Sequence, residues 1–499
     1  MNEQKGAVSQ LSKDVRMARE IAREVKKQGG HTYYVGGYVR DLQLSIPNKD
    51  IDIEVHGITP EQLRNILDKL GTVLTIGQSF GILNLKGYDL DIAQPRMEKN
   101  SGRGHKDFEI SVDPFIGVEK AAKRRDFTMN ALMQDVLTGE LIDPFGGLQD
   151  LQNGIIRHVD DNSFIEDPLR VLRACQFAAR FQFDVAPETL ELCKRIDISS
   201  LPKERIAMEL DKALLKARRP SVFFESLQNM EHMEWFPEVE ALKGVPQNPI
   251  YHPEGDVYIH TMMTLDAAAK LRSQAEYPKY FMIAALCHDF GKVVATTTEN
   301  GVHAINHETA GLSCIRKFLS RIYNENAMTA YVTNLTEHHM KTHLTYQNQS
   351  RVRKTNELFD SVKCVNDLIL LTRADSLGRT GVDYATVDKE EAWLRERAKM
   401  YMDRLKEPTF TAKDLLELGV KPSPAFKEIL DKTHHLHLCG VEKEHVLKQI
   451  LPQVKGEAAE IVREAIRVQE ARRQEDVLIR NQPANDIDEQ EQEYDLELE

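Results

Sequence analysis

The stretch Tyr34–Glu54, YVGGYVRDLQLSIPNKDIDIE, combines an apolar strand end, a glycine pair and two closely spaced carboxylates. Asp50 and Asp52 flank Ile51, and residues two apart on a strand point to the same face of a sheet. Adjacent carboxylates repel each other unless a cation lies between them, and hard oxygen ligands suit Mg²⁺ with a bound phosphate. The paired glycines Gly36 and Gly37 allow the backbone to approach phosphate oxygens closely. The stretch therefore predicts a metal–phosphate site of the kind that supports nucleotidyl transfer.

A second predicted strand, Tyr88–Ala93, carries a third carboxylate. Asp91 points toward the same site if Leu90 and Ile92 face the opposite side, and it would then complete a two-metal centre. The alternative is an acidic residue on an edge strand. Each of these short patterns alone occurs often in turns and solvated strands, so the prediction depends on their combination.

Four further motifs follow in order along the chain. They are Arg96–His105 (RMEKNSGRGH), Lys123–Ala131 (KRRDFTMNA), Asp143–Leu151 (DPFGGLQDL) and Glu166–Arg173 (EDPLRVLR). Together with the glycine pair and the two aspartates, they resemble the polymerase-β-type nucleotidyltransferases. More narrowly, they resemble the bacterial tRNA nucleotidyltransferases of the class II and poly(A) polymerase superfamily, which build the 3′-terminal CCA. The resemblance extends over residues 31–450.

The resemblance implies a role for each matching residue. Asp50 and Asp52 would hold Mg²⁺ with help from Asp91, and Gly37 with Arg40 would grip the triphosphate. The implied nucleotide-binding set is Gly36, Gly37, Arg40, Arg125, Asp126, Glu166, Asp167, Arg170 and Arg173.

Nucleotide choice is expected to depend on the start of a helix. Asp167 and Arg170 lie three residues apart and share a helix face. The resemblance implies that they select CTP or ATP without a nucleic-acid template. The alternative is an ordinary helix-start acid with an ion pair. Relatives usually have Arg at the position of Gln176, so Gln176→Arg is predicted to tighten nucleotide binding.

A second set of metal ligands occurs downstream, in the order His260, His288–Asp289, His307, His338–His339 and Asp375. Imidazole and carboxylate ligands from separate helices would hold a divalent metal of open identity, and a metal-bound water could attack a phosphoester. A lone buried His is more often a core residue, but this ordered set resembles the HD phosphohydrolase superfamily.

The segments 252–269 and 285–292 resemble the HD domain fused to some CCA-adding enzymes, where it carries phosphatase and 2′,3′-cyclic phosphodiesterase activity. The implied ligands are His260, His288, Asp289 and Asp375, with His307 and His339 as further candidates.

The predicted architecture is an α/β nucleotidyltransferase head of polymerase-β type, followed by an all-α neck, an HD-type helical domain and a helical C-terminal segment. Apolar spacing predicts an N-terminal helix in 1–30, and strand signals alternate with helices up to residue 157 and then vanish. The expected segments are 1–30 (helix), 31–157 (head), 158–245 (neck), 246–400 (HD domain), 401–460 (tRNA-binding segment) and 461–499 (helical extension with a disordered acidic tail).

The composition limits the partners and the compartment. The net charge is −13, but eight acidic residues fall in 481–499, and local basic clusters such as Lys123–Arg125 and Arg351–Lys354 can still contact RNA. Six scattered cysteines without a C-x-x-C pair predict a reducing compartment and no thiolate metal site. No apolar run is long enough for a membrane helix and no secretory signal is visible, so a cytoplasmic location is expected.

The expected function is addition of C, C and A from CTP and ATP to the 3′ end of tRNA, with a second hydrolytic site and no obligate protein partner. Several alternatives stay open: a partial CC-adding or A-adding enzyme, a poly(A) polymerase, an HD phosphohydrolase with a nucleotide-binding head, and a nonenzymatic RNA-binding protein. The loop from Glu98 to His105 favours full addition, since CC-adding relatives lack it.

Overall fold

The computed structural model describes residues 2–48, 50–76, 82–100 and 108–480. It divides into two compact units, one formed by residues 1–332 with 378–380 and the other by residues 333–377 with 381–499. Residues 101–107, which include the second half of the predicted loop Glu98–His105, and the predicted acidic tail 481–499 lie outside the described residues. None of the described helices has the length and apolar character that a membrane crossing requires.

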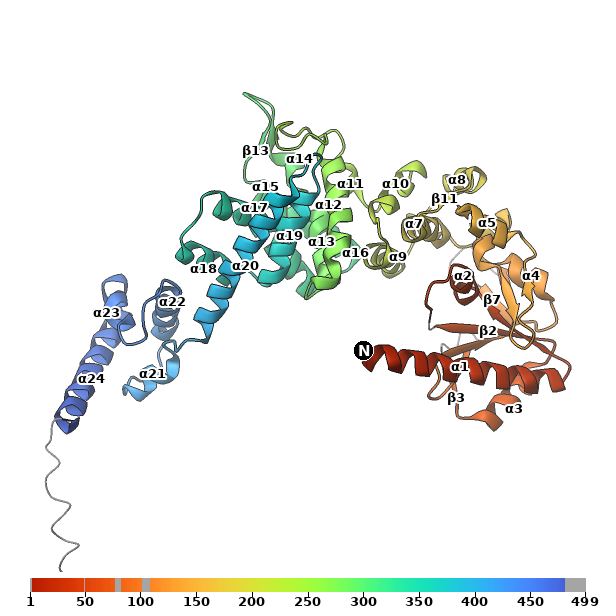
Figure 1. Ribbon diagram of the computed structural model, residues 1–499, viewed down its shortest axis with the longest axis horizontal. Helices are drawn as coiled ribbons and strands as arrows, with labels where there is room; N and C mark the ends of the chain where they lie inside the picture. Colours follow the sequence, from red (N-terminus) through yellow and green to blue (C-terminus); the bar gives the residue numbers. More distant parts are fainter. Residues whose placement is uncertain (1, 49, 77–81, 101–107, 481–499) are drawn as a thin grey trace, which may run out of the picture. The chain divides into compact units, whose positions relative to one another are not determined.

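A seven-stranded mixed sheet organises the N-terminal part of the first unit, with the strand order β3-β4-β5-β2-β1-β8-β9. Strands β2 and β3 mark this sheet in Figure 1. Its strands are β1 (His31–Val35), β2 (Ile51–His56), β3 (Val73–Ile76), β4 (Ile82–Leu85), β5 (Leu90–Ala93), β8 (Met133–Asp135) and β9 (Leu141–Ile142). Within this sheet β2 and β5 pair in parallel, and the other neighbouring strands pair antiparallel. Because β5 lies between β4 and β2, Asp91 is on an interior strand, and the edge-strand alternative is wrong.

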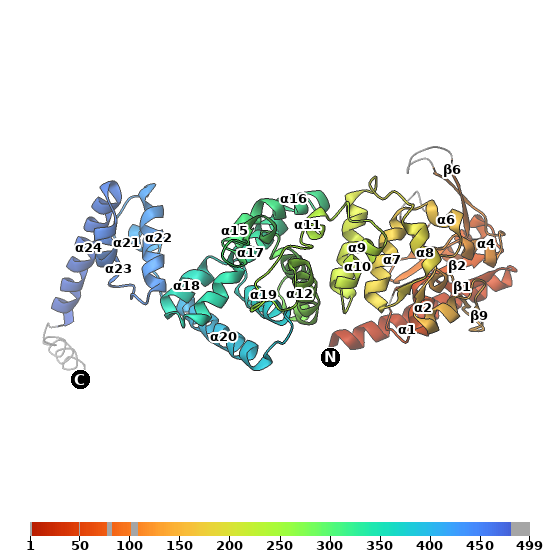
Figure 2. The ribbon, with the colours of Figure 1, turned by 90° about the horizontal axis from the view of Figure 1, so that it is seen from above.

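Strand β2 shows why the sheet has one polar face. Ile51, Ile53 and Val55 are almost fully buried and alternate with polar residues, as the two-residue period of a strand requires. Helix α1 (Asn2–Lys27) lies along the sheet beside β1 and β2 (Figures 1 and 2). It buries the apolar stripe Ala18, Ile21, Ala22 and Val25. The predicted N-terminal helix is therefore present, and it covers the sheet.

The rest of the first unit is mainly helical. The further elements of the head are α2 (Gly37–Gln43), α3 (Pro60–Leu70), the hairpin β6 (Arg96–Asn100) with β7 (Phe108–Val112), α4 (Val118–Lys123), η1 (Thr128–Asn130), α5 (Gly147–Asn153) and β10 (Ile155–Ile156). The helices that follow are α6 (Asp161–Ile165), α7 (Leu169–Phe181), α8 (Pro187–Cys193), α9 (Lys203–Lys216), α10 (Ser221–Asn229), α11 (Pro237–Glu240), α12 (Val257–Leu271), η2 (Arg272–Gln274), α13 (Pro278–Cys287), α14 (Lys292–Ala295), α15 (His307–Ala310) and α16 (Leu312–Ile322).

The expectation that strands end near residue 157 needs a small correction. Strand β11 (Asp184–Val185) pairs with β10, and β12 (Thr296–Thr297) pairs with β13 (His303–Ala304). Each of these strands has two residues, which is too short for a two-residue alternation to be visible in the sequence.

The second unit is entirely helical within its described residues. Helix α17 (Asn326–Gln347) contains the boundary between the units, and the helices after it are α18 (Val352–Asp360), α19 (Val365–Leu377), α20 (Tyr384–Lys406), α21 (Ala412–Glu417), α22 (Ala425–Leu438), α23 (Val446–Ile450), η3 (Leu451–Gln453) and α24 (Gly456–Arg480). One apolar cluster joins α18, α19 and α20 with Leu438 at the end of α22, and a second joins α21 to α24.

Candidate active sites

The three carboxylates predicted to bind metal gather at the start of β2. Parallel pairing of β2 with β5 places Asp52 directly beside Asp91. Asp50 was expected on the strand with Asp52, but it lies immediately before β2. Its backbone N–H donates to Asn48 Oδ1 at 3.0 Å.

Asp52 lies in an electrostatic environment that favours a bound cation. Burial raises its pKa to about 6; the charge of Arg125 opposes this rise, and the charges of Asp91 and Asp50 add to it. A divalent ion would remove the repulsion among the carboxylates, and their oxygen atoms are the ligands that Mg²⁺ prefers. The donor set of the head therefore fits magnesium.

Arg125 is positioned beside these carboxylates by two neighbours. Gly36 has a φ of +64°, and a Cβ there would lie 2.9 Å from Arg125 Nη1 and 3.7 Å from Asp52 Oδ2. On the other side, Arg125 Nη2 lies 3.4 Å from Glu54 Oε2. Glycine at position 36 thus leaves room for the guanidinium, and Glu54 holds it.

Glu54 is a residue that the motif search missed. Its Oε1 lies 2.9 Å from His56 Nε2. Burial alone would raise the pKa of Glu54, but the hydrogen bond from His56 and the charge of Arg125 lower it. The alternation along β2 was a usable signal, because it places Glu54 on the same face as Asp52.

Arg40, predicted to grip a triphosphate, is 4% exposed and has partners within the protein. Its Nε and Nη2 donate to Asp41 Oδ1 at 2.8 and 2.6 Å, and its Nη1 donates to Asn130 Oδ1 at 2.7 Å. The guanidinium also lies over the rings of Phe177 and Phe181, at 5.1 and 4.8 Å from their centroids. Arg40 therefore connects α2 with η1 and α7.

Asp126 and Arg173 form a second connection between the head and α7. Arg173 Nε and Nη2 lie 2.7 and 2.6 Å from Asp126 Oδ2. Asp126 Oδ1 accepts from the backbone N–H of Phe127 and from Asn130 Nδ2, both at 2.9 Å. Burial would raise the pKa of Asp126, but the charge of Arg173, the hydrogen bond from Asn130 and the charge of Arg170 together lower it. The pair joins a buried carboxylate to a partly exposed guanidinium.

Asp167 and Arg170 lie at the start of α7, and each has additional contacts. Arg170 donates from Nη1 to the Ser163 carbonyl at 2.6 Å and from Nη2 to the Arg124 carbonyl at 2.7 Å, which fixes the plane of its guanidinium. Asp167 Oδ2 accepts from Arg205 Nη2 at 2.9 Å. Arg205 was not predicted, although a cation in the first turn of a helix such as α9 opposes the helix dipole and signals a carboxylate partner.

Glu166 and Gln176 differ in exposure. Glu166 is exposed directly after α6. Gln176 is 1% exposed, and its Nε2 has no hydrogen-bond partner within the part of the chain that the structure describes. An arginine in its place would be a buried charge, so the burial argues against the predicted benefit of Gln176→Arg.

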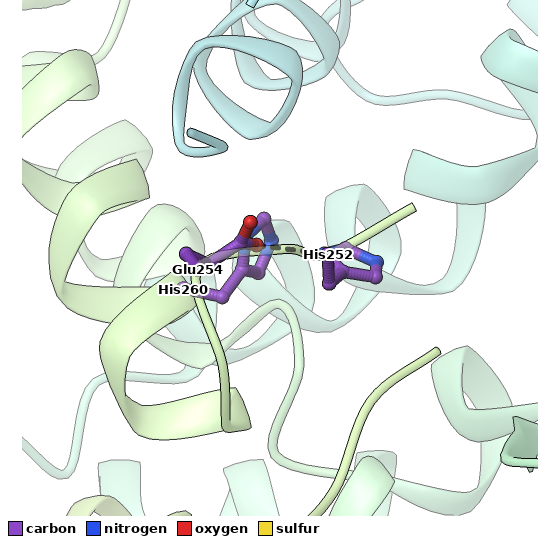
Figure 3. A group of neighbouring side chains, drawn as sticks. All are labelled: His252, Glu254 and His260. Atoms are coloured by element: carbon purple, nitrogen blue, oxygen red, sulfur yellow. Dashed lines mark hydrogen bonds and ion pairs between the residues drawn. The ribbon is translucent and has the colours of Figure 1, made fainter. Parts of the chain in front are cut away.

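A second group of titratable side chains lies at the start of α12. Figure 3 shows Glu254 between His252 and His260, with its Oε1 at 2.9 Å from Nδ1 of each ring. Burial would raise the pKa of Glu254, but these hydrogen bonds lower it to about 2. Nδ1 of His260 also faces the Gly378 carbonyl at 3.1 Å. Both neighbours of this nitrogen are acceptors, so it carries the proton and the lone pair is on Nε2.

The lone pair of His260 converges with those of the His-Asp pair at the end of α13. His260 Nε2 lies 3.4 Å from His288 Nε2 and 3.7 Å from Asp289 Oδ2, and the latter two atoms are 3.3 Å apart. His288 donates from Nδ1 to the Ala285 carbonyl at 2.8 Å, so its Nε2 also presents a lone pair. Three electron-pair donors that point at one another suit a divalent cation, with separations close to those around a metal bound at about 2 Å.

His307 and Lys292 complete the surroundings of Asp289. His307 donates from Nδ1 to the Ala304 carbonyl at 2.8 Å, and its Nε2 lies 3.2 Å from Asp289 Oδ1. Lys292 Nζ lies 2.7 Å from Asp289 Oδ2 and 2.8 Å from Gln247 Oε1. Burial would raise the pKa of Asp289, but the charges of His288 and Lys292 hold it well below its usual range.

The remaining two predicted ligands, His339 and Asp375, belong to the second unit. His339 donates from Nδ1 to the Thr336 carbonyl at 2.6 Å, the same pattern as His288 and His307. Asp375 Oδ2 lies 3.2 Å from His343 Nε2, and His343 Nδ1 lies 2.9 Å from Glu390 Oε1. Burial would lower the pKa of His343, but its two carboxylate neighbours raise it to about 9. His343 and Glu390 were not predicted.

Comparison with protein families gives two matches. The poly A polymerase head domain matches residues 32–157, and the HD domain matches residues 257–380. The first match covers the sheet with Asp52 and Arg125, and the second begins at α12 and includes His260, His288 and Asp289.

Two curated proteins are similar over most of this chain. The multifunctional CCA protein of Mannheimia succiniciproducens is 35% identical over 378 residues, which are 73% of this chain and 88% of the relative. That of Pasteurella multocida is 33% identical over 439 residues, which are 84% and 98% of the two chains.

Solved structures share the fold at lower identity. A CCA-adding enzyme with ATP has a TM-score of 0.60 at 20% identity, covering 89% of this chain and 95% of the other. A CCA-adding enzyme in complex with CTP has a TM-score of 0.59 at 20% identity, covering 88% of this chain and 95% of the other. The Thermotoga maritima CCA-adding enzyme in complex with tRNA has a TM-score of 0.56 at 20% identity, covering 88% of this chain and 95% of the other.

Proposed function

We propose a two-site mechanism for this chain, which belongs to the multifunctional CCA proteins, the CCA-adding tRNA nucleotidyltransferases that combine a poly A polymerase head domain with an HD domain. The chain is a nucleotidyltransferase that adds CCA to tRNA. The parallel pairing of β2 with β5, which puts Asp52 beside Asp91, is the observation that carries the assignment of the transfer site. Solved enzymes of this fold bind ATP, CTP and tRNA, and we assign the same ligands to this chain.

The transfer step would take place at the carboxylates of the head. The 3′-hydroxyl of tRNA attacks the α-phosphorus of CTP or ATP, a phosphodiester forms, the α–β anhydride bond breaks and pyrophosphate leaves. The hydroxyl proton passes to solvent. Asp50, Asp52 and Asp91 would hold Mg²⁺, which when bound would stabilise the charge that develops on the phosphoryl oxygens.

Arg125 is the side chain that we assign to the phosphates. It is partly exposed beside Gly36 and Asp52, so an anion can reach it. Glu54 keeps its guanidinium in place before the nucleotide arrives, and such pre-organisation lowers the entropic cost of binding. Gly36 and Gly37 would let the triphosphate approach the backbone.

Arg40, Asp126 and Arg173 would support nucleotide binding mainly by joining α7 to the head. All three have their partners inside the protein, and α7 carries the base-selecting residues. A rigid connection would keep the base-selecting residues Asp167 and Arg170 at a constant distance from the transfer site.

Asp167 and Arg170 are assigned to base selection, with Glu166 at the exposed entrance. The two carbonyls that fix Arg170 and the arginine that holds Asp167 would pre-organise a flat set of donors and acceptors. A site of this kind rejects the wrong base because its own polar groups would then be buried without partners.

The HD site is assigned to hydrolysis of phosphate esters. His260, His288, Asp289 and His307 of the first unit would hold a divalent metal that when bound would activate water, and Asp375 and His339 stay ligands predicted from the sequence. Glu254 orients His260, and Lys292 places a positive charge next to Asp289 where a phosphate would lie. For a 2′,3′-cyclic phosphate, the water oxygen bonds to phosphorus, one ester bond breaks and the released hydroxyl takes a proton. A phosphomonoester would be cleaved in the same manner.

The functional division follows the segments expected from the motifs: head 31–157, neck 158–245, HD domain 246–400 and tRNA-binding segment 401–460. Six free cysteines are typical of a reducing compartment, which supports a cytoplasmic location.

Product sequencing tests the function. The protein is incubated with Mg²⁺, CTP, ATP and a tRNA that ends at the nucleotide before the CCA, and the 3′ ends are sequenced. We expect ends in CCA and no further addition. Ends in CC, addition of A only to a tRNA that already carries CC, or long A tails would identify the partial enzymes or the poly(A) polymerase instead.

A further inference from the structure

We propose a zinc site in the second unit, formed by Glu357 on α18, His435 on α22 and Cys439 just after α22. Their ligand atoms all lie within 4.8 Å of one another, and this group is separate from the ligands of the HD site. The sequence predicted no thiolate site because it has no C-x-x-C pair. The structure brings a cysteine together with ligands that lie 4 and 82 residues away along the chain.

The geometry is close to that of a tetrahedral zinc centre. His435 Nε2 lies 3.9 Å from Cys439 Sγ and 3.6 Å from Glu357 Oε1. Ligands bound to zinc at about 2.0–2.3 Å are separated by roughly 3.3–3.7 Å, so the two separations from His435 Nε2 are within a few tenths of an ångström of those around a bound ion. All three ligand atoms lie within 4.8 Å of one another, and rotation of the Cys439 and Glu357 side chains would close the remaining separation. His435 and Cys439 are four residues apart and lie on one side of the helix end.

The chemical types of the ligands select the ion. A thiolate, an imidazole and a carboxylate together favour Zn²⁺ over Mg²⁺ or Ca²⁺, which prefer oxygen alone. Glu357 and Cys439 are half-buried and the His435 side chain is 45% exposed, so an ion can enter from solvent with a water as its fourth ligand.

Arg353 would have to leave when the ion binds. Its Nε lies 2.8 Å from Glu357 Oε1, and its Nη2 lies 3.3 Å from His435 Nε2. The Arg353 side chain is 60% exposed, and an ion pair between exposed side chains contributes little to stability. Binding would also release the Cys439 thiol proton to the buffer. Both costs are small compared with the free energy that a structural zinc ion supplies.

The ion would fasten the end of α22 to α18. Two contacts outside the proposed site also join these helices: Asn356 Nδ2 donates to the Leu438 carbonyl at 2.9 Å, and His434 Nε2 lies 2.9 Å from Asp360 Oδ1. His434 resembles His435 in position and in its acidic partner on α18, but it has no thiol beside it. It therefore provides a matched control.

Cobalt substitution tests the proposal directly. The full-length protein, reduced and freed of metal by a chelator, is titrated with Co²⁺ while the absorption band of a cobalt–thiolate bond is recorded. The HD ligands are nitrogen and oxygen atoms, so they do not give this band. We expect the band in the wild type and in His434→Ala, and its loss in Cys439→Ser and His435→Gln. Absence of the band in the wild type, or its persistence in Cys439→Ser, would overturn the proposal.

A second measurement needs only the wild-type protein. The rate of alkylation of each cysteine is followed by mass spectrometry with and without Zn²⁺. Zinc should slow alkylation of Cys439 several-fold and leave Cys314, which is also partly exposed, unchanged. Equal alkylation rates of Cys439 with and without zinc would contradict the site.

Discussion

Glu54 acts on the transfer site through another side chain. It lies on β2 two residues after Asp52 and holds Arg125 by an ion pair of 3.4 Å. Glu54→Gln keeps the shape but removes the charge, so Arg125 should spend less time in the position that meets a phosphate. We expect KM for CTP and ATP to rise about tenfold, with a smaller change in kcat, because a hydrogen bond to a charged group contributes about 1.5–3 kcal/mol.

The matched control for this variant is Glu61→Gln, at an exposed position of α3, which should leave both KM and kcat unchanged. An unchanged KM for both nucleotides in folded Glu54→Gln would show that Arg125 needs no support or does not meet the phosphates.

Asp52 should reduce the stability of the metal-free protein. An aspartate whose pKa is raised on folding, here to about 6, destabilises the folded state above that pH. The cost shrinks as the pH falls toward the unfolded value of about 4 and is absent below it. Asp52→Asn should therefore raise the free energy of unfolding of the metal-free protein at pH 7 by about 2 kcal/mol, and with it the Tm, and should abolish nucleotide addition.

Calorimetry between pH 4 and 8 checks this expectation, since the difference in Tm should grow as the pH rises from about 4 to about 6 and stay constant above that. Addition of Mg²⁺ should raise the Tm of the wild type more than that of the variant. Equal Tm values at every pH would contradict the account of Asp52.

Gln176 shows a limit of motif reading at single residues. Relatives usually have Arg at this position, which suggested that a phosphate or base contact is missing here, but the Gln176 side chain is 1% exposed. Gln176→Arg should lower the free energy of unfolding by about 3 kcal/mol, because it buries a charge, and should not lower KM. Gln176→Leu should be nearly neutral, since it removes a buried amide nitrogen that has no hydrogen-bond partner among the described residues. A lower KM with unchanged Tm in Gln176→Arg would show that the arginine reaches the nucleotide.

At the scale of elements, two glycines bring α14 and α15 together. A Cβ on Gly291 would lie 1.9 Å from the His307 carbonyl oxygen and 2.6 Å from the Gly311 nitrogen. This close approach sets His307 beside Asp289. Gly291→Ala should separate the helices and reduce HD hydrolysis about 10²-fold, as expected for a misplacement near 1 Å, without affecting nucleotide addition.

The control for this variant is Gly71→Ala, where the added Cβ would make an ordinary 3.6 Å contact with Leu85. Both activities should survive that change. Full hydrolysis by Gly291→Ala would show that the helices can move apart without displacing the ligands.

The elements themselves were largely predictable. Apolar spacing and start signals in the sequence predict helices over 169–180, 204–216 and 221–230, and α7, α9 and α10 begin and end within one residue of these bounds. The place of β5 inside the sheet was not predictable, since strand order depends on contacts between distant segments. For the same reason the sequence does not identify Asp167 as the partner of Arg205 or Glu357 as a neighbour of Cys439, whereas the alternation along β2 did signal Glu54.

At the scale of the whole molecule, the two proposed activities depend on different segments. The poly A polymerase head domain ends at residue 157 and the HD domain begins at residue 257. We expect either site to work when the other is inactivated. A tRNA that ends in a cyclic phosphate has no free 3′-hydroxyl, so the HD site would have to act on it before the head can.

The measurement that tests this division most directly follows two tRNAs through Asp52→Asn, Asp289→Asn and the wild type. One tRNA ends in a free 3′-hydroxyl and the other in a 2′,3′-cyclic phosphate. The wild type should convert both to CCA ends. Asp289→Asn should extend only the hydroxyl end, and Asp52→Asn should open the cyclic phosphate without adding a nucleotide. Extension of the cyclic-phosphate tRNA by Asp289→Asn, or loss of both activities in either folded variant, would contradict the account.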